Sequence, residues 1–211
     1  MILKTKLFGH VYEFKSIREV MAKANEEKSG DKLAGIAAET AEERVAAKVV
    51  LSNLTLNDLR NCPAVPYEED EVTRIIQDSV NETIFNEYKN MTVAEFREWL
   101  LDTQTTPDMI RRASRGLTSE IVAGVCKLMS NLDLIYAAKK MRVTAHCNTT
   151  IGLPGTFSSR LQPNHTTDDP NGIIASVMEG LSLGCGDAVI GLNPVDDSVE
   201  SVARILRSEE R

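Results

Sequence analysis

The order of elements predicted after residue 150 constrains the fold of this chain more than any other feature of its sequence. Segments typical of strands alternate with longer amphipathic segments: a strand at 156–162, a helix at 170–184, a strand at 187–193 and a helix at 196–210. Asp196 or Asp197 is expected to cap the last helix. Strands joined by a single helix of this length require a right-handed crossover and therefore lie parallel. The sequence thus predicts an α/β arrangement here.

The residues before this region have a helical pattern. Five helix starts are marked by hydroxyl side chains: Ser16 with Glu19, Thr40 with Glu43, Thr92 with Glu95, Thr106 before Pro107, and Thr118 at the start of an amphipathic run to Ser130. Gly30 and Gly116 are predicted to end helices. We therefore divide the chain into a helical region, 1–147, and an α/β region, 148–211.

The distribution of charge excludes some classes of partner. The 211 residues carry a net charge of -7 without a Lys/Arg block that could follow a phosphate backbone, so we expect no nucleic-acid partner. An acidic cluster at 68–71 precedes a helix predicted over 72–88, and we interpret it as a solvent-facing helix start rather than a cation site. The first residues lack the apolar stretch of a signal peptide, and no run approaches the ~20 apolar residues of a membrane span. We expect a cytoplasmic protein without membrane contact.

Cysteine and histidine spacing gives no metal or redox motif. The four cysteines form no CxxC pair, and we predict that they are reduced and mostly buried: Cys62, Cys126, Cys147 and Cys185. His146 precedes Cys147, but neighbours on an extended chain point to opposite faces, which disfavours a nucleophile pair. We predict no metal ligands.

Period-two alternation places polar side chains on one face of the two predicted strands. Arg160 and Gln162 share a face of the first strand, and Asn193 shares a face of the second with Val189 and Gly191. In a parallel barrel this face looks inward, and the carboxyl ends of the strands form the active-site rim. Two interpretations remain open. The polar groups converge on a ligand, or the arginine forms an ordinary salt bridge and the Gln-Pro and Asn-Pro steps simply end the strands.

Several long segments carry a resemblance to a known family: KTKLFGHVYEFKSIREVMAKANEEKSGDKLAGIAAETAEERVAAK, YEEDEVTRIIQD, VNET, GLTSEIVAGVCKLMSNLDLIYAAKKM, NTTIGLPGTFSSRLQPNHTTDD and GDAVIGLNPVDD. Together they resemble the large subunit of ethanolamine ammonia-lyase over essentially the whole chain. The LPGTFSSRLQPN and GDAVIGLNP segments are the most specific, because they carry polar residues at strand ends that no generic barrel requires.

The resemblance implies an adenosylcobalamin-dependent lyase that converts ethanolamine to acetaldehyde and ammonia by radical chemistry. It implies a helical amino-terminal region followed by a (β/α)8 TIM-type barrel, with cobalamin between large and small subunits at the barrel mouth. The family's substrate-contacting positions fall on Arg160, Gln162 and Asn193, of which Arg160 is also assigned a catalytic role, and a cobalamin-contacting position falls on Pro194. The implied partners are ethanolamine, the small subunit and further large subunits. The implied location is the cytoplasm, including the interior of a bacterial microcompartment.

The chain departs from the family pattern at its carboxyl end. It stops after the second βα unit, whereas a complete barrel takes ~250 residues. We therefore expect an incomplete barrel, further active-site carboxylates outside this chain, and no activity of the chain alone. Two other functions remain open: a non-catalytic helical interaction module derived from this subunit, and an unrelated phosphate-binding α/β enzyme. The second is disfavoured because a phosphate-binding glycine motif must lie between a strand and the helix that follows it, and no glycine-rich segment of this sequence is predicted there.

Overall fold

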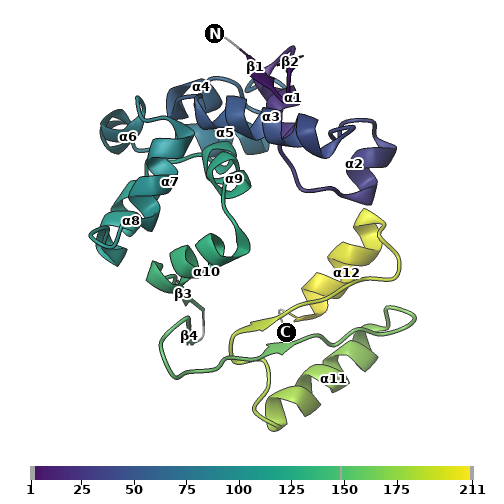
Figure 1. Cartoon of the computed structure of the whole chain (residues 1–211). Coiled ribbons are helices and arrows are strands. Elements are labelled where there is room, and N and C mark those ends of the chain that lie inside the picture. Colours follow the sequence, from purple (N-terminus) through teal and green to yellow (C-terminus); the bar gives the residue numbers. More distant parts are fainter. Residues whose placement is uncertain (1–2, 148, 210–211) are drawn as a thin grey trace. The chain divides into compact units, whose positions relative to one another are not determined.

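The computed structural model describes residues 3–147 and 149–209, and the chain forms two compact units, Met1–Met141 and Arg142–Arg211 (Figure 1). The first unit is helical apart from one β-hairpin, and the second combines two longer helices with short strands. The chain therefore has the α/β character predicted for it. The predicted boundary at residue 147 lies shortly after the end of the first unit.

The first unit begins with an antiparallel hairpin that the sequence analysis did not predict. Strand β1 (Lys4–Leu7) pairs with β2 (His10–Glu13), with Leu7 opposite His10. The two turn residues between the strands both have positive φ, 53° at Phe8 and 83° at Gly9. This is the backbone of a two-residue hairpin turn, whose twist matches that of the flanking strands. Glycine adopts positive φ freely, but phenylalanine rarely does, so the pair Phe8-Gly9 does not indicate this turn in a sequence.

Ten helices follow in the described part of this unit: α1 (Ile17–Lys23), α2 (Ser29–Leu33), α3 (Ala41–Ser52), α4 (Leu56–Arg60), α5 (Glu71–Asp78), α6 (Glu82–Tyr88), α7 (Val93–Leu101), α8 (Pro107–Ser114), α9 (Ser119–Lys127) and α10 (Asn131–Lys140). All five predicted capping residues are confirmed, because each side-chain oxygen accepts a backbone N–H of the first turn: Ser16, Thr40, Thr92, Thr106 and Thr118. The reciprocal bond differs among them. Glu95 reaches back to the N–H of Thr92 itself, whereas Glu19 accepts from Lys15 and Glu43 from Glu39.

Three helix boundaries in this unit differ from the prediction. The single helix predicted over 72–88 is two helices, because the Asn81 side chain caps α6 and the Asn81 backbone N–H donates to Arg115 O at 2.8 Å. Gly30 lies inside α2 instead of ending a helix, while Gly116 does follow α8. The helix that starts after Thr118 ends at Lys127, and Ser130 caps a new one.

The core of the first unit is formed by α1, α3, α4, α7 and α9, with α3 also packed against the hairpin. Its most deeply buried side chains are fully shielded from solvent: Val20, Leu51, Leu56, Val93 and Ile121. Burial of one such side chain contributes about 1.5–3 kcal/mol, so this unit has a hydrophobic core of its own. An aromatic group, Tyr88, Phe96 and Trp99, extends it with ring centroids 5.0–5.7 Å apart.

The second unit follows the predicted order of strand, helix, strand and helix. Strand β5 (Arg160–Leu161) pairs parallel with β6 (Val189–Ile190). Helix α11 (Pro170–Ser182) connects the two strands, and α12 (Val199–Glu209) follows β6 and contacts α11. The parallel pairing is confirmed, but both strands are much shorter than predicted. A small antiparallel hairpin, β3 (Ala145–His146) with β4 (Thr150–Ile151), precedes them and was not predicted.

The start of α12 also differs from the prediction. Ser198 Oγ accepts the N–H of Ser201 at 3.3 Å, and Asp196 Oδ1 accepts the N–H of Ser198 at 2.9 Å. The serine therefore supplies the cap, and the aspartate supports the turn before it.

Candidate functional site

The strand pair β5–β6 presents one polar and one apolar face. Arg160 pairs with Val189 and Leu161 with Ile190, so alternate residues point to opposite sides. The Leu161 side chain packs against Gly180 of α11, where an added Cβ would lie 2.6 Å from its methyl groups. The side of Leu161 and Ile190 therefore faces helix α11, and the side of Arg160 is exposed to solvent.

The three predicted substrate-contacting residues lie in strand β5 or just beyond the carboxyl ends of β5 and β6. Arg160 opens β5, Gln162 follows it directly, and Asn193 comes shortly after β6; all three are exposed. Pro194 follows Asn193 and is half-buried. Backbone bonds extend the parallel ladder past the strands, from Ala188 N–H to Ser159 O at 3.2 Å and from Gly191 N–H to Leu161 O at 2.9 Å. The pairing thus brings residues that are some thirty positions apart to the same end of the sheet.

Gly191 provides the space in which the Arg160 guanidinium lies. A Cβ added to this glycine would be 2.5 Å from Arg160 Nη2 and 2.8 Å from Nε, closer than nonbonded atoms approach. The guanidinium therefore crosses the neighbouring strand directly over the glycine. The alternation of the strand placed Gly191 on the polar face, without predicting a role for it.

The polar groups on this face are not paired with one another. Within residues 3–147 and 149–209, the side chains of Arg160, Gln162 and Asn193 have no hydrogen bond or ion pair to a protein group. The alternative of an ordinary salt bridge for Arg160 thus has no support in the described chain. The face offers one guanidinium, which only donates, and two amides, which donate and accept.

A loop after β5 holds the segment after β6 through side-chain acceptors. Asn164 Oδ1 accepts the N–H of Asn193 at 3.0 Å, and the Asp168 carboxylate accepts those of Val195 at 3.0 Å and Asp196 at 2.8 Å. These backbone donors, that of Asp196 foremost, lower the pKa of Asp168. Neither acceptor was predicted, because its partners lie far away in the sequence.

The opposite end of the strand pair is fixed by Asp187. Its Oδ1 accepts both the N–H of Ser159 at 2.7 Å and the hydroxyl of Ser159 at 2.6 Å, and the same hydroxyl oxygen accepts the N–H of Gly186 at 3.0 Å. The Ser159 side chain, followed by its backbone N–H, lowers the pKa of Asp187. Both ends of this two-stranded sheet are thus tied by aspartates.

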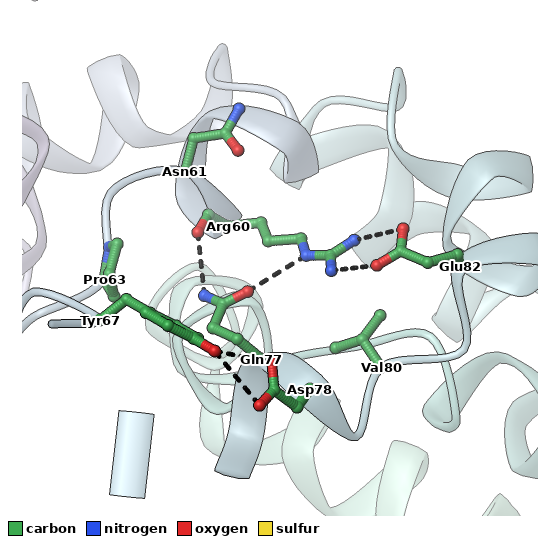
Figure 2. Close-up of a pocket in the computed structure, with 8 residues that line it drawn as sticks. All are labelled: Arg60, Asn61, Pro63, Tyr67, Gln77, Asp78, Val80 and Glu82. Carbon is green, nitrogen blue, oxygen red and sulfur yellow. Dashed lines mark hydrogen bonds and ion pairs between the residues drawn. The ribbon is translucent and has the colours of Figure 1, made fainter. Parts of the chain in front are cut away.

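A separate hollow of about 540 Å³ lies in the first unit, next to Arg60 (Figure 2). Its polar groups are paired with one another. Arg60 donates to Gln77 Oε1 at 3.2 Å and to Glu82, Gln77 donates back to Arg60 O at 3.0 Å, and the Tyr67 hydroxyl bonds the Asp78 carboxylate. The guanidinium also lies 4.4 Å from the centre of the Phe85 ring. These contacts join α4, α5 and α6 and occupy the polar side chains that line the hollow apart from the exposed Asn61, so we assign it a structural role.

The prediction of mostly buried cysteines is wrong. All four are free and exposed: Cys62, Cys126, Cys147 and Cys185. They occupy positions that face solvent, such as the turn between Gly184 and Gly186, both of which have positive φ. His146 Nδ1 lies 2.9 Å from Thr150 Oγ1 and Cys147 Sγ donates to Thr149 O, so these two neighbours do not pair with each other.

The acidic cluster before α5 takes part in helix capping. Asp70 accepts the N–H and the hydroxyl of Thr73, and these bonds lower its pKa. Glu71 pairs with Arg74 one turn along. In the described part of the chain, no three His, Cys, Asp or Glu residues are grouped so as to hold a metal ion, and no helix is long and apolar enough to cross a membrane.

Comparison with known proteins identifies the family. The family described as "Ethanolamine ammonia lyase large subunit (EutB)" matches residues 12–210. The ethanolamine ammonia-lyase large subunits of Escherichia coli (strain K12) and Salmonella typhimurium are each 59% identical to this chain over 206 residues, which is 98% of the chain and 46% of the relative. The chain thus spans about half the length of the curated relatives it matches. It belongs to the ethanolamine ammonia-lyase large subunit family.

Proposed function

We propose that this chain supplies part of the substrate site of an ethanolamine ammonia-lyase, which converts ethanolamine to acetaldehyde and ammonia. The observation that carries the proposal is the exposed polar face of β5 and β6, where Arg160, Gln162 and Asn193 are free of protein partners in the described chain. Family membership extends through these positions. Nothing among the described residues favours the alternative of a non-catalytic interaction module.

The chemistry of the side chains suits the two ends of ethanolamine. The guanidinium of Arg160 has donors only and suits the hydroxyl oxygen of the substrate, where it stabilises negative charge that builds up as the amino group migrates. The amide oxygens of Gln162 and Asn193 accept from the ammonium. Because a guanidinium and an ammonium repel each other, a carboxylate must balance them. Asp168 and Asp187 are committed to neighbouring N–H and hydroxyl groups, so we propose that the balancing acid lies outside these two units.

We propose adenosylcobalamin as the cofactor, held in part by the residues after β6. Pro194, which is half-buried, and Val195, which is 68% exposed, form an apolar pair directly after Asn193 in the chain. An apolar surface beside an amide suits a corrin ring, which has a broad apolar face and amide side chains around its edge. The cobalt is part of the cofactor. Adenosylcobalamin supplies the radical chemistry when it is bound, and the residues of this chain supply orientation and electrostatics.

We further propose that β5 and β6 are the first strands of a (β/α)8 barrel. Each strand is paired on one edge only among the described residues, and a strand with an unpaired edge is a template for further strands. In this proposal the enzyme contains the small subunit and further large subunits, and works in the cytoplasm, including inside a bacterial microcompartment. The relatives are named as large subunits, which supports a small-subunit partner.

A hybrid enzyme tests this function. The chain replaces the matching portion of the Escherichia coli large subunit, and the hybrid is assembled with the small subunit and adenosylcobalamin. We expect acetaldehyde release from ethanolamine, its loss in Arg160→Ala, and its retention in the control Arg207→Ala, which removes an exposed arginine of α12. An assembled hybrid that releases no acetaldehyde would contradict the proposed function. Normal turnover in Arg160→Ala would contradict the assigned site.

A further inference from the structure

Every backbone N–H of the segment 193–196 is accepted by a side chain of the loop after β5. Asn193 donates to Asn164, and Val195 and Asp196 donate to Asp168. The remaining residue of the segment is Pro194, which has no N–H to donate. Two side chains from the loop after β5 therefore accept every backbone N–H of this segment, which contains Asn193 and Pro194 of the proposed site.

Asp168 is held in a conformation that only its surroundings explain. Its φ is +53°, in the left-handed region that residues other than glycine rarely adopt, and 4% of its surface is exposed. Such a conformation persists where neighbouring contacts over-determine it, and it recurs at functional sites. The next residue, Asp169, caps α11 by accepting from Asn171 and Gly172. Because the cap of α11 fixes the backbone directly after Asp168, the Asp168 carboxylate is held in position to accept from residues 195 and 196.

The same loop begins directly after the strand that carries the other two proposed contacts. Gln162 precedes it, and the Gln162 carbonyl accepts the N–H of Asn164 at 2.9 Å. Asn164 thus joins the ends of β5 and β6 through one residue. The hydrogen bonds accepted by Asn164 and Asp168 lie next to the proposed ligand contacts and not in the hydrophobic core. They therefore fix the distance between the ends of β5 and β6.

We infer that Asn164 and Asp168 are positioning residues that hold Asn193 and Pro194 in register with Arg160 and Gln162 for ethanolamine and the cofactor. The inference rests on the proposed function for its catalytic consequence. The clamp itself is a property of this chain and is testable without turnover. We refer below to Asn164 and Asp168 together as the loop clamp.

The first experiment measures the clamp in the 211-residue chain by NMR. Asp168→Asn keeps the size of the side chain and a preference for the left-handed region, but replaces one carboxylate oxygen with a donor that faces other donors. We expect the amides of Val195 and Asp196 to exchange with solvent about tenfold faster or more, because bonds to a charged acceptor are among the stronger ones. Amides of α3 should keep their wild-type exchange. Unchanged exchange at 195 and 196 would overturn the clamp.

The second experiment measures the consequence in the hybrid enzyme. Asn164→Ala removes an acceptor on an exposed residue and so carries little risk to folding, whereas Asn164→Asp keeps an acceptor oxygen. We expect kcat/KM for ethanolamine to fall about 10- to 100-fold in Asn164→Ala and Asp168→Asn, as misplacement near 1 Å produces, with rescue by Asn164→Asp. Asp197→Asn is the matched control, because Asp197 is exposed and has no hydrogen bond in the described chain.

The outcomes separate the two proposals. Three results would overturn the positioning role. The first is a loss in Asn164→Ala that Asn164→Asp does not rescue, and the second is wild-type kinetics in both Asn164→Ala and Asp168→Asn. The third is an equal loss in the control Asp197→Asn. An unmodified hybrid without activity would instead overturn the proposed function, while amide exchange at 195 and 196 would still decide whether the clamp exists.

Discussion

Replacing Gly191 with alanine disturbs Arg160 without altering the arginine itself. The added Cβ would lie 2.5 Å from Arg160 Nη2 and 3.0 Å from Cζ, whereas nonbonded heavy atoms prefer about 3.5–4.0 Å. The guanidinium must therefore move by about 1 Å or more. Because Gly191 does not have a positive φ, alanine adds no backbone strain, and the side chain that yields is the exposed end of an arginine.

A displacement of this size at a catalytic group costs about 100-fold in rate, or about 2.7 kcal/mol of transition-state stabilisation. The assay is kcat/KM for ethanolamine in the hybrid enzyme, together with the unfolding midpoint of the chain. We expect Gly191→Ala to lose most of its kcat/KM while the unfolding midpoint changes little. Gly30→Ala is the matched control, since Gly30 has ordinary φ and open space around its Cα, and it should leave kinetics unchanged.

A double-mutant cycle isolates the arginine as the cause. If Gly191→Ala acts only through Arg160, it should add almost nothing in an Arg160→Ala background. Full additivity of the two losses would refute the reasoning, as would normal kcat/KM in the Gly191→Ala enzyme.

Three further predictions follow from the same geometry. Gln162→Ala and Asn193→Ala should each weaken ethanolamine binding by about 1–3 kcal/mol and cobalamin binding by less, which titration of the hybrid with each ligand measures; equal weakening would contradict their substrate role. The lowered pKa values of Asp168 and Asp187 contribute stability that is present above their usual value of 3.8 and is lost as pH falls through the lower folded value. Amide protection in the second unit should therefore decline below about pH 4, and the decline should be smaller in Asp168→Asn, which keeps only Asp187; protection independent of pH would refute this. The 211-residue chain alone should release no acetaldehyde, and its amides in helices before residue 145 should exchange more slowly than those of β5 and β6; acetaldehyde release by the chain would overturn this expectation.

Local signals in the sequence were sufficient for five of the helix starts, although the similar caps at Thr55 and Ser130 were missed. A capping hydroxyl acts on backbone groups within three residues, so Ser16, Thr40 and Thr92 could be identified without knowledge of the fold. The break between α5 and α6 could not, because the apolar pattern continues across it. Two bonds mark it: the local cap in which Asn81 Oδ1 accepts the N–H of Ile84, and a tertiary contact from the Asn81 backbone N–H to Arg115 O.

The polar face was predictable in part because the period of a strand is local. Alternation placed Arg160 and Gln162 on one side, and the crossover rule gave the parallel pairing with β6. The loop clamp was not predictable, since Asp168 acts on residues 27 and 28 positions away and its left-handed backbone has no reliable signal in sequence. The exposed cysteines show the same limit, because burial statistics for a residue type do not fix the side of a helix or turn on which it lies.

The most direct test of the central claim is a structure of the assembled hybrid enzyme with ethanolamine and cobalamin bound. We predict that the Arg160 guanidinium donates to the substrate hydroxyl oxygen, and that the amide oxygens of Gln162 and Asn193 accept from its ammonium, at hydrogen-bond distances of about 2.7–3.2 Å. Ethanolamine bound elsewhere in the enzyme, with these three side chains still facing solvent, would contradict the claim that this strand face is a substrate site.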